Sequence, residues 1–234
     1  MGVPTRLPSG VSTSAVGKNM GNYPLPNPTQ AFTYFNDFSN YAAADWTVTN
    51  TTSHAAIALT AGQGGQMSIA GGASSVTSDI GAIQITPANF NFIVGQQVWF
   101  NASIKATTAL NDQLQIGLAS SIAALAPTDG MYFNKAAASA SVDFVIRKGS
   151  TSTTLSAVGT LVDGTFLRLG YYYNGKDTVF VYVNHVLVAS TQVLTNLTTA
   201  TALAPGFGIK AAATAPTTGN IVCDYITAAQ DITR

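Results

Sequence analysis

The sequence predicts an all-β protein built as a two-sheet antiparallel β-sandwich, and three observations support this fold class. Short stretches alternate between apolar and polar residues with a period of two. Glycine, proline, asparagine and aspartate separate these stretches at short intervals. No amphipathic stretch with helical spacing reaches ten residues. About a dozen short strands with frequent turns are typical of a sandwich or jelly roll.

Strands are expected where the alternation is clearest. In chain order they cover residues 32–38, 45–49, 56–60, 66–70, 80–85, 97–105, 113–119, 131–133, 142–147, 154–158, 207–209 and 221–228, with three more inside 166–190. Residues 121–126 are expected to form one helical turn that Pro127 stops.

The segment 166–190 gives the strongest local signal. Alternating Leu and Tyr residues lead into Asn174-Gly175, which is followed by alternating valines. Asn-Gly between alternating strands predicts a hairpin. Asn184-His185 predicts a second tight turn, because both residue types tolerate positive φ. His185 therefore needs no chemical role.

The first 29 residues differ from the rest and predict an extended arm, with the sandwich domain covering residues 30–234. Five of the nine prolines lie in this arm, with glycines between them, so a regular strand or helix is disfavoured. A floppy terminus and a segment ordered against a partner are both compatible with this composition. The residues that we expect to contact a partner are Arg6, Tyr23, Pro24, Leu25 and Pro26.

Charge is scarce, and this limits the functions that the chain supports. All ten acidic residues are aspartate, the net charge is zero, and charged residues make up 9% of the chain against roughly 25% in an ordinary soluble domain. We expect no nucleic-acid partner, because the only adjacent basic pair is Arg147–Lys148. No apolar run is long enough to span a membrane, so we expect a soluble protein made in a cytoplasm.

Residues for enzymatic chemistry are also sparse, so we expect no enzyme and no cofactor. Hydrolysis of glycosides on a sandwich uses a carboxylate pair, whereas the aspartates here are scattered singly near predicted turns. Zinc needs three or four ligands, and two distant histidines with one cysteine do not supply them. Cys223 is the only cysteine and is expected in the core. A calcium ion at Asp129 or Asp163 remains open, since Ca²⁺ takes oxygen ligands.

Trp46 and Trp99 are the residues to weigh for glycan stacking. Trp99 shares the polar side of its strand with Gln97 and Asn101, which is compatible with glycan stacking. We expect instead that Trp99 packs against a second layer or a neighbouring subunit.

Several segments resemble a known fold family. Residues 170–188, GYYYNGKDTVFVYVNHVLV, are similar to the penultimate hairpins of concanavalin A-like (laminin G-like) jelly rolls, with His185 in place of the usual glycine. Residues 35–38 (FNDF), 45–48 (DWTV) and 83–100 also resemble parts of such domains. Residues 31–232 as a whole resemble tailed-bacteriophage virion proteins, with DGMYF at 129–133 and DFVIRK at 143–148.

The resemblance implies a structural virion protein that decorates the outside of a capsid as a cement protein. It implies the major capsid protein and copies of the chain itself as partners, a homotrimer, and a location on the capsid exterior after assembly in the host cytoplasm. The alternative is a carbohydrate-binding module of a tail fibre or adhesin, because a lectin-like fold does not fix a function.

Overall fold

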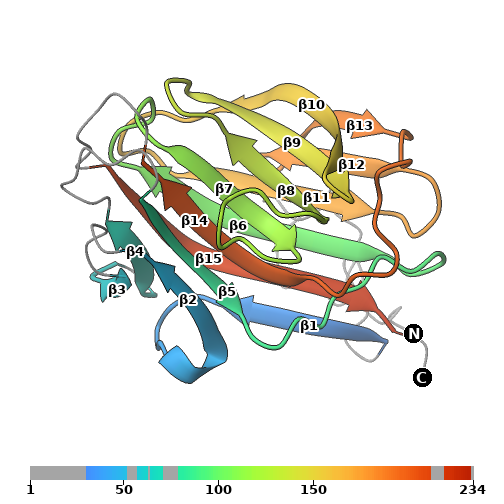
Figure 1. Ribbon diagram of the computed structural model, residues 1–234, viewed down its shortest axis with the longest axis horizontal. Coiled ribbons are helices and arrows are strands. Elements are labelled where there is room, and N and C mark those ends of the chain that lie inside the picture. Colours follow the sequence, from blue (N-terminus) through green and yellow to red (C-terminus); the bar gives the residue numbers. More distant parts are fainter. Residues whose placement is uncertain (1–29, 52–56, 63, 71–78, 212–218, 233–234) are drawn as a thin grey trace, which may run out of the picture.

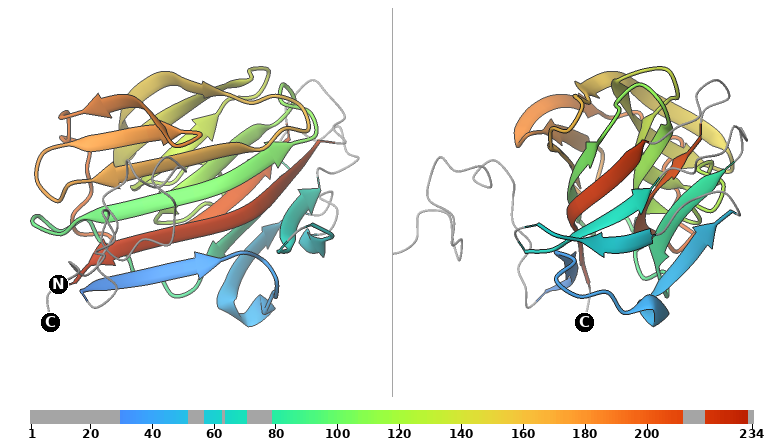
Figure 2. Two further views of the ribbon diagram at one scale, coloured as in Figure 1. Left: turned by 180° about the vertical axis from the view of Figure 1, so that it is seen from behind. Right: turned by 90° about the vertical axis from the view of Figure 1, so that its left-hand side faces the viewer.

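Two antiparallel β-sheets pack face to face in the computed structural model of the protein, which describes residues 30–51, 57–62, 64–70, 79–211 and 219–232. Figure 1 shows both layers, and Figure 2 shows them from behind and from the side. The predicted fold class is confirmed. The arm at residues 1–29 lies outside the described residues, so its extended form and the division into arm and domain stay predictions.

The eight-stranded layer, called sheet A, runs in the order β13-β12-β11-β6-β15-β4-β3, and β1 also pairs with β15. Its strands are β1 (Ala31–Asn36), β3 (Ile57–Thr60), β4 (Gln66–Ala70), β6 (Val98–Ala106), β11 (Leu167–Tyr173), β12 (Val179–Val183), β13 (Val186–Thr191) and β15 (Asn220–Asp231).

The seven-stranded layer, called sheet B, runs in the order β10-β9-β8-β7-β14-β5-β2. Its strands are β2 (Trp46–Asn50), β5 (Ile80–Ile85), β7 (Gln113–Ala119), β8 (Gly130–Lys135), β9 (Ser141–Lys148), β10 (Thr151–Thr160) and β14 (Ala204–Lys210). The one helix among the described residues is the 3-10 turn η1 (Ala43–Asp45).

Every predicted strand is present, but the ends differ and one element is wrong. The period-two pattern places each strand, whereas the ladder extends past the expected ends in β10 and β15. The helical turn expected at 121–126 is not a helix. It contains a single turn, in which Leu125 N donates to Ile122 O. The segment does not form a helix because Ile122 and Leu125 both pack on the outer face of sheet B.

The core lies between the sheets and is rich in aromatic rings. Phe100 stacks on Tyr171 with ring centroids 5.2 Å apart and an angle of 15° between planes, an arrangement worth about 1 kcal/mol beyond the buried area. The Tyr171 hydroxyl donates to Met131 O of the opposite sheet at 3.0 Å. This bond satisfies a fully buried polar group and ties the two layers together.

Both predicted turns in 166–190 are confirmed. Asn174 Oδ1 accepts from the backbone N–H groups of residues 176, 177 and 178, and Gly175 has a φ of 75°. Asn184 and His185 have φ values of 50° and 66°, as a two-residue hairpin turn of type I′ requires. These turns fix which side chains of β11, β12 and β13 face outward.

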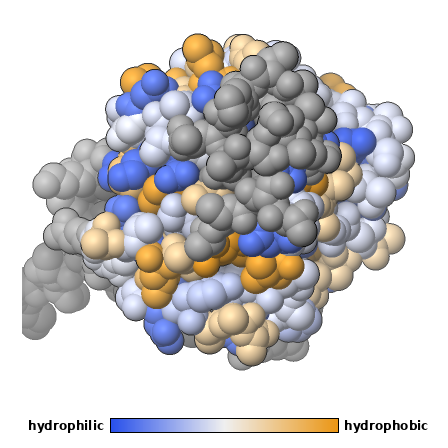
Figure 3. Space-filling model, turned by 60° about the vertical axis from the view of Figure 1, so that its left-hand side comes forward, coloured by the Kyte–Doolittle hydropathy of each residue, from blue (hydrophilic) through white to orange (hydrophobic). Residues whose placement is uncertain are grey.

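The surface mixes apolar and polar side chains. On the face in Figure 3 the hydrophobic side chains form small groups among polar ones. The exposed large apolar residues include three consecutive ones on the edge strand β13, namely Val186, Leu187 and Val188. Within the described part of the chain, no helix has the length and hydropathy to cross a membrane.

Candidate functional site

The outer face of sheet A carries a row of three aromatic side chains. The ladder pairs Trp99 of β6 with Tyr172 of β11, and Tyr172 with Phe180 of β12. The ring centroids of Trp99 and Tyr172 lie 5.5 Å apart at 29°, and those of Tyr172 and Phe180 lie 5.9 Å apart at 16°. We call these three residues the aromatic row. Successive side chains of a strand point to opposite faces. Trp99 and Tyr172 therefore face outward, because their neighbours Phe100 and Tyr171 face the core.

Polar groups border the aromatic row. The Tyr172 hydroxyl donates to Gln97 Oε1 at 2.7 Å, and burial raises the pKa of this phenol. On the same face, the Tyr225 hydroxyl of β15 donates to Asn101 Oδ1 of β6 at 3.1 Å. Phe35, which is 65% exposed, packs against Tyr225 with centroids 6.5 Å apart. This face therefore combines exposed ring surface with amide and phenol groups.

The two tryptophans lie in different environments, Trp46 in the core between the sheets and Trp99 on the outer face of sheet A. Trp46 belongs to the core and packs against Phe38, so it offers no surface for stacking. Trp99 faces outward as its alternation predicts, but it is only 7% exposed and its indole Nε1 is buried without a hydrogen-bond partner. The half-buried rings of Tyr172 and Phe180 therefore carry the accessible part of the row.

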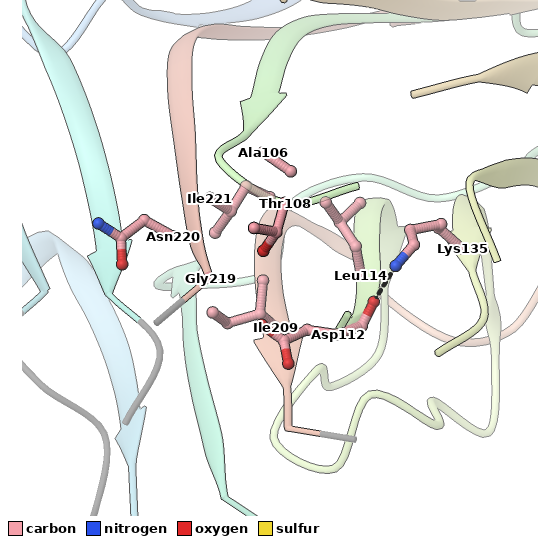
Figure 4. Close-up of a pocket in the computed structure, with 9 residues that line it drawn as sticks. All are labelled: Ala106, Thr108, Asp112, Leu114, Lys135, Ile209, Gly219, Asn220 and Ile221. Carbon is pink, nitrogen blue, oxygen red and sulfur yellow. Dashed lines mark hydrogen bonds between the residues drawn. The ribbon is translucent and has the colours of Figure 1, made fainter. Parts of the chain in front are cut away.

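A second polar site lies inside the sandwich, at one end of β7 and β8. Lys135 is 2% exposed, and its Nζ donates to the backbone oxygen of Asp112. Figure 4 shows the Lys135 ammonium and Asp112 side by side in a small pocket with Thr108 and Asn220. The cavity volume is about 10 Å³, which is the size of one water molecule.

Burial sets the charge of this lysine. Removal from water lowers the Lys135 pKa from 10.5 to about 8, and the nearby Asp112 carboxylate opposes this shift. A cavity of this size does not admit a sugar or a nucleotide. The pocket is therefore a buried polar cluster whose chemistry bears on stability rather than on ligand binding.

The residues predicted to contact a partner or a metal ion do not gather at one site among the described residues. Arg6, Tyr23, Pro24, Leu25 and Pro26 lie outside the described residues, as does His54. His185 lies in its hairpin turn, and burial lowers its pKa. Asp129 accepts from Gly149 N and Asp163 from Ala109 N at 2.6 Å, so these carboxylates hold loops to one another. In the ranges that the structure describes, no three His, Cys or Asp side chains gather as a metal site.

Sequence reasoning missed Lys135 although a signal was present. Lys135 follows Met131 and Phe133 at inward-facing positions of β8, so strict alternation places its ammonium in the core. Cys223 was placed correctly: it is buried, and burial raises the pKa of its thiol well above the usual value.

Comparisons with known proteins agree on the fold. The family model described as "SO2946-like, C-terminal domain" matches residues 67–223. The crystal structure of SO2946, a protein of unknown function from Shewanella oneidensis MR-1, is 18% identical, with a TM-score of 0.61 over 88% of this chain and 89% of that one. A comparison with curated proteins finds no match.

Two further solved structures extend this likeness. An endo-1,3-beta-glucanase from Streptomyces sioyaensis is 12% identical, with a TM-score of 0.63 over 89% of this chain and 99% of that one. The carbohydrate recognition domain of Emp47p is 7% identical, with a TM-score of 0.59 over 88% and 100%. At these identities the likeness shows the jelly-roll fold, as in lectins and glucanases.

Proposed function

This chain belongs to the SO2946-like, C-terminal domain family, and within that family we propose that it acts as a non-catalytic carbohydrate-binding domain. The observation that carries the proposal is the aromatic row on the outer face of sheet A. Sugars present apolar C–H faces and a rim of hydroxyls. Rings with an apolar body and a polar edge suit such ligands, and a few placed polar groups fix their orientation.

The groups beside the row match this chemistry. Gln97 and Asn101 are amides that both donate and accept hydrogen bonds, and each already holds a phenol of the same face. The glycan would lie over Tyr172 and Phe180, with its hydroxyls near these amides. Carbohydrate recognition in Emp47p and glucanase activity in the Streptomyces protein, both on the same fold, support this proposal over the capsid hypothesis.

The proposal leaves out catalysis because of the acidic residues. Glycoside hydrolysis uses two carboxylates held about 5–9.5 Å apart across the scissile bond. The chain has no glutamate, and Asp129, Asp163 and Asp177 are engaged in loop and turn hydrogen bonds. Turnover of any polysaccharide by the purified protein would contradict this part of the proposal.

Replacing Tyr172 with alanine tests the glycan-binding face. For a glycan identified on an array, Tyr172→Ala should weaken binding at least 10-fold, or about 1.4 kcal/mol, because the central ring of the row is lost. Tyr172→Phe is the matched control: it keeps the ring and loses only the bond to Gln97, so it should retain most of the affinity. Isothermal titration gives both values. Wild-type affinity in Tyr172→Ala, or no glycan bound by the wild type, would reject the proposal.

One observation favours a second candidate, the capsid decoration role. Val186, Leu187 and Val188 are 62%, 51% and 45% exposed on the edge strand β13, and exposed apolar residues grouped in this way mark protein contacts. Under this proposal the chain is a homotrimer that binds the major capsid protein. Deleting residues 1–29 should leave a folded sandwich that no longer binds capsids in co-sedimentation, and full occupancy by the deletion variant would argue against the arm's role.

A further inference from the structure

The connection between β7 and β8 folds back over the outer face of sheet B instead of projecting into solvent (Figure 1). Ile122 and Leu125 of this connection are 2% and 3% exposed, and they form a small apolar cluster with Ile80, Ala82 and Ala119 of the sheet. The cluster is separate from the main core between the sheets. We call residues 121–127 the cover segment.

Hydrogen bonds hold the cover segment at its base and over its middle. Ser120 N donates to Asp129 O at 2.9 Å, which closes the base. Gln113 Nε2, on the outer face of β7, donates to Leu125 O at 3.1 Å. The cover segment is thus attached by one amide contact, two apolar side chains and its base.

Small residues line the outer face of sheet B beneath the cover segment. The ladder places Gly117 of β7 beside Gly206 of β14, and Gly208 beside Gln115. A Cβ atom at Gly206 would lie 2.9 Å from Ile122 Cδ1, so the cover segment rests directly on this floor. Removing the cover segment would expose this strip of small residues, and we call the exposed strip the groove.

Gln115 is the unexplained residue of this face. It points outward, because Leu114 and Ile116 point into the core, yet it is 0% exposed. Both Gln115 Oε1 and Nε2 are buried without a hydrogen-bond partner. A buried amide that bonds to nothing is costly, and native structures seldom keep one without a reason.

The cover segment itself holds strain. Leu125 has a φ of 49°, in the left-handed region that residues with a branched side chain seldom adopt. Such backbone strain is concentrated at switch regions and ligand clamps. The covered arrangement thus combines an unsatisfied amide with a strained residue directly above the same groove.

We propose that the cover segment is a displaceable lid over an amide-lined groove, and that a neutral polyhydroxylated ligand, a stretch of polysaccharide, takes its place. Gln113 and Gln115 of β7 and Asn134 of β8 lie on this outer face and supply uncharged donors and acceptors. Gln84 Nε2 is already bonded to Ala119 O and Ala204 O. Gln113 Nε2 donates to Asn134 Oδ1 of the neighbouring strand β8 at 3.3 Å. The ligand class rests on the proposed function, whereas the groove is on sheet B, opposite the aromatic row.

The test weakens the lid and leaves the sheet intact. The double variant Ile122→Ser with Leu125→Ser removes the apolar anchors. A second variant replaces residues 121–127 with Gly-Gly, which the closed base at Ser120 and Asp129 permits. Each is made with and without Gln115→Ala, and a cooperative urea transition confirms that it folds. The probes are laminarin, barley β-glucan, xylan and galactomannan, with affinity electrophoresis as the measurement.

We expect both lid variants to bind at least one of the four polysaccharides 10-fold or more tightly than the wild type, and Gln115→Ala to remove that gain. Hydrogen exchange at 120–129 should also rise when the wild type is saturated with that polysaccharide. No gain with any probe, or a gain that Gln115→Ala leaves unchanged, would overturn the lid. Adding Tyr172→Ala separates the two sites: loss of the gain would assign it to the aromatic row, and persistence assigns it to the groove.

Discussion

Gly117→Ala is expected to destabilise the protein by about 3 kcal/mol or more. A Cβ atom at this position would lie 2.5 Å from Cα and Cβ of Tyr132 and 2.6 Å from Met131 O. Backbone atoms of a central strand cannot withdraw easily, and overpacking alone costs about 1–3 kcal/mol. The φ of 156° adds strain of about 1–3 kcal/mol.

Gly164→Ala is the matched control for this prediction. Gly164 also has a positive φ, 67°, but an added Cβ would meet nothing within 4 Å. Only the backbone term then applies, so the expected loss is about 1–2 kcal/mol. Urea unfolding of the two variants measures the difference. Equal losses would show that β8 moves aside and that the close approach of β7 and β8 at Gly117 is not a constraint.

Lys135 is expected to make stability rise with pH between about 8 and 10. The Lys135 pKa is about 8 in the folded protein against the usual 10.5. Between these values the unfolded chain binds a proton that the folded protein does not, so the free energy of unfolding increases with pH. From pH 7 to pH 9.5 the gain due to Lys135 should be about 2 kcal/mol. Below pH 8 the buried charge persists and the gain is absent.

Comparison with Lys135→Met isolates this effect. Cys223 acts in the opposite direction, because burial raises its pKa and its thiol ionises first in the unfolded chain. This contribution is present in both proteins and cancels in their difference. The stability of Lys135→Met relative to wild type should therefore fall by about 2 kcal/mol from pH 7 to pH 9.5. A constant difference, measured by urea unfolding, would mean that Lys135 stays charged throughout.

The sequence by itself determined the fold class and the strand order along the chain. Period-two alternation in β6 and β7 separates core from surface positions, because successive side chains of a strand point to opposite faces. Asn174-Gly175 and Asn184-His185 marked their turns, since few residue types accept positive φ there. The outward direction of Trp99 also followed from alternation. These are local properties, which neighbouring residues fix without reference to distant parts of the chain.

Only the tertiary structure decided what each outward-facing residue meets. The aromatic row requires β6, β11 and β12 to be neighbours in one register, and Trp99 of β6 lies 73 positions before Tyr172 of β11 along the chain. The residues 121–126 carry no local mark that distinguishes a helical turn from an irregular segment packed on the sheet, because their apolar partners Ile80 and Ala82 belong to a distant strand. The burial of Gln115 and of Lys135 is likewise a property of the assembled sheets, since the space around a side chain depends on elements that the local sequence does not contain.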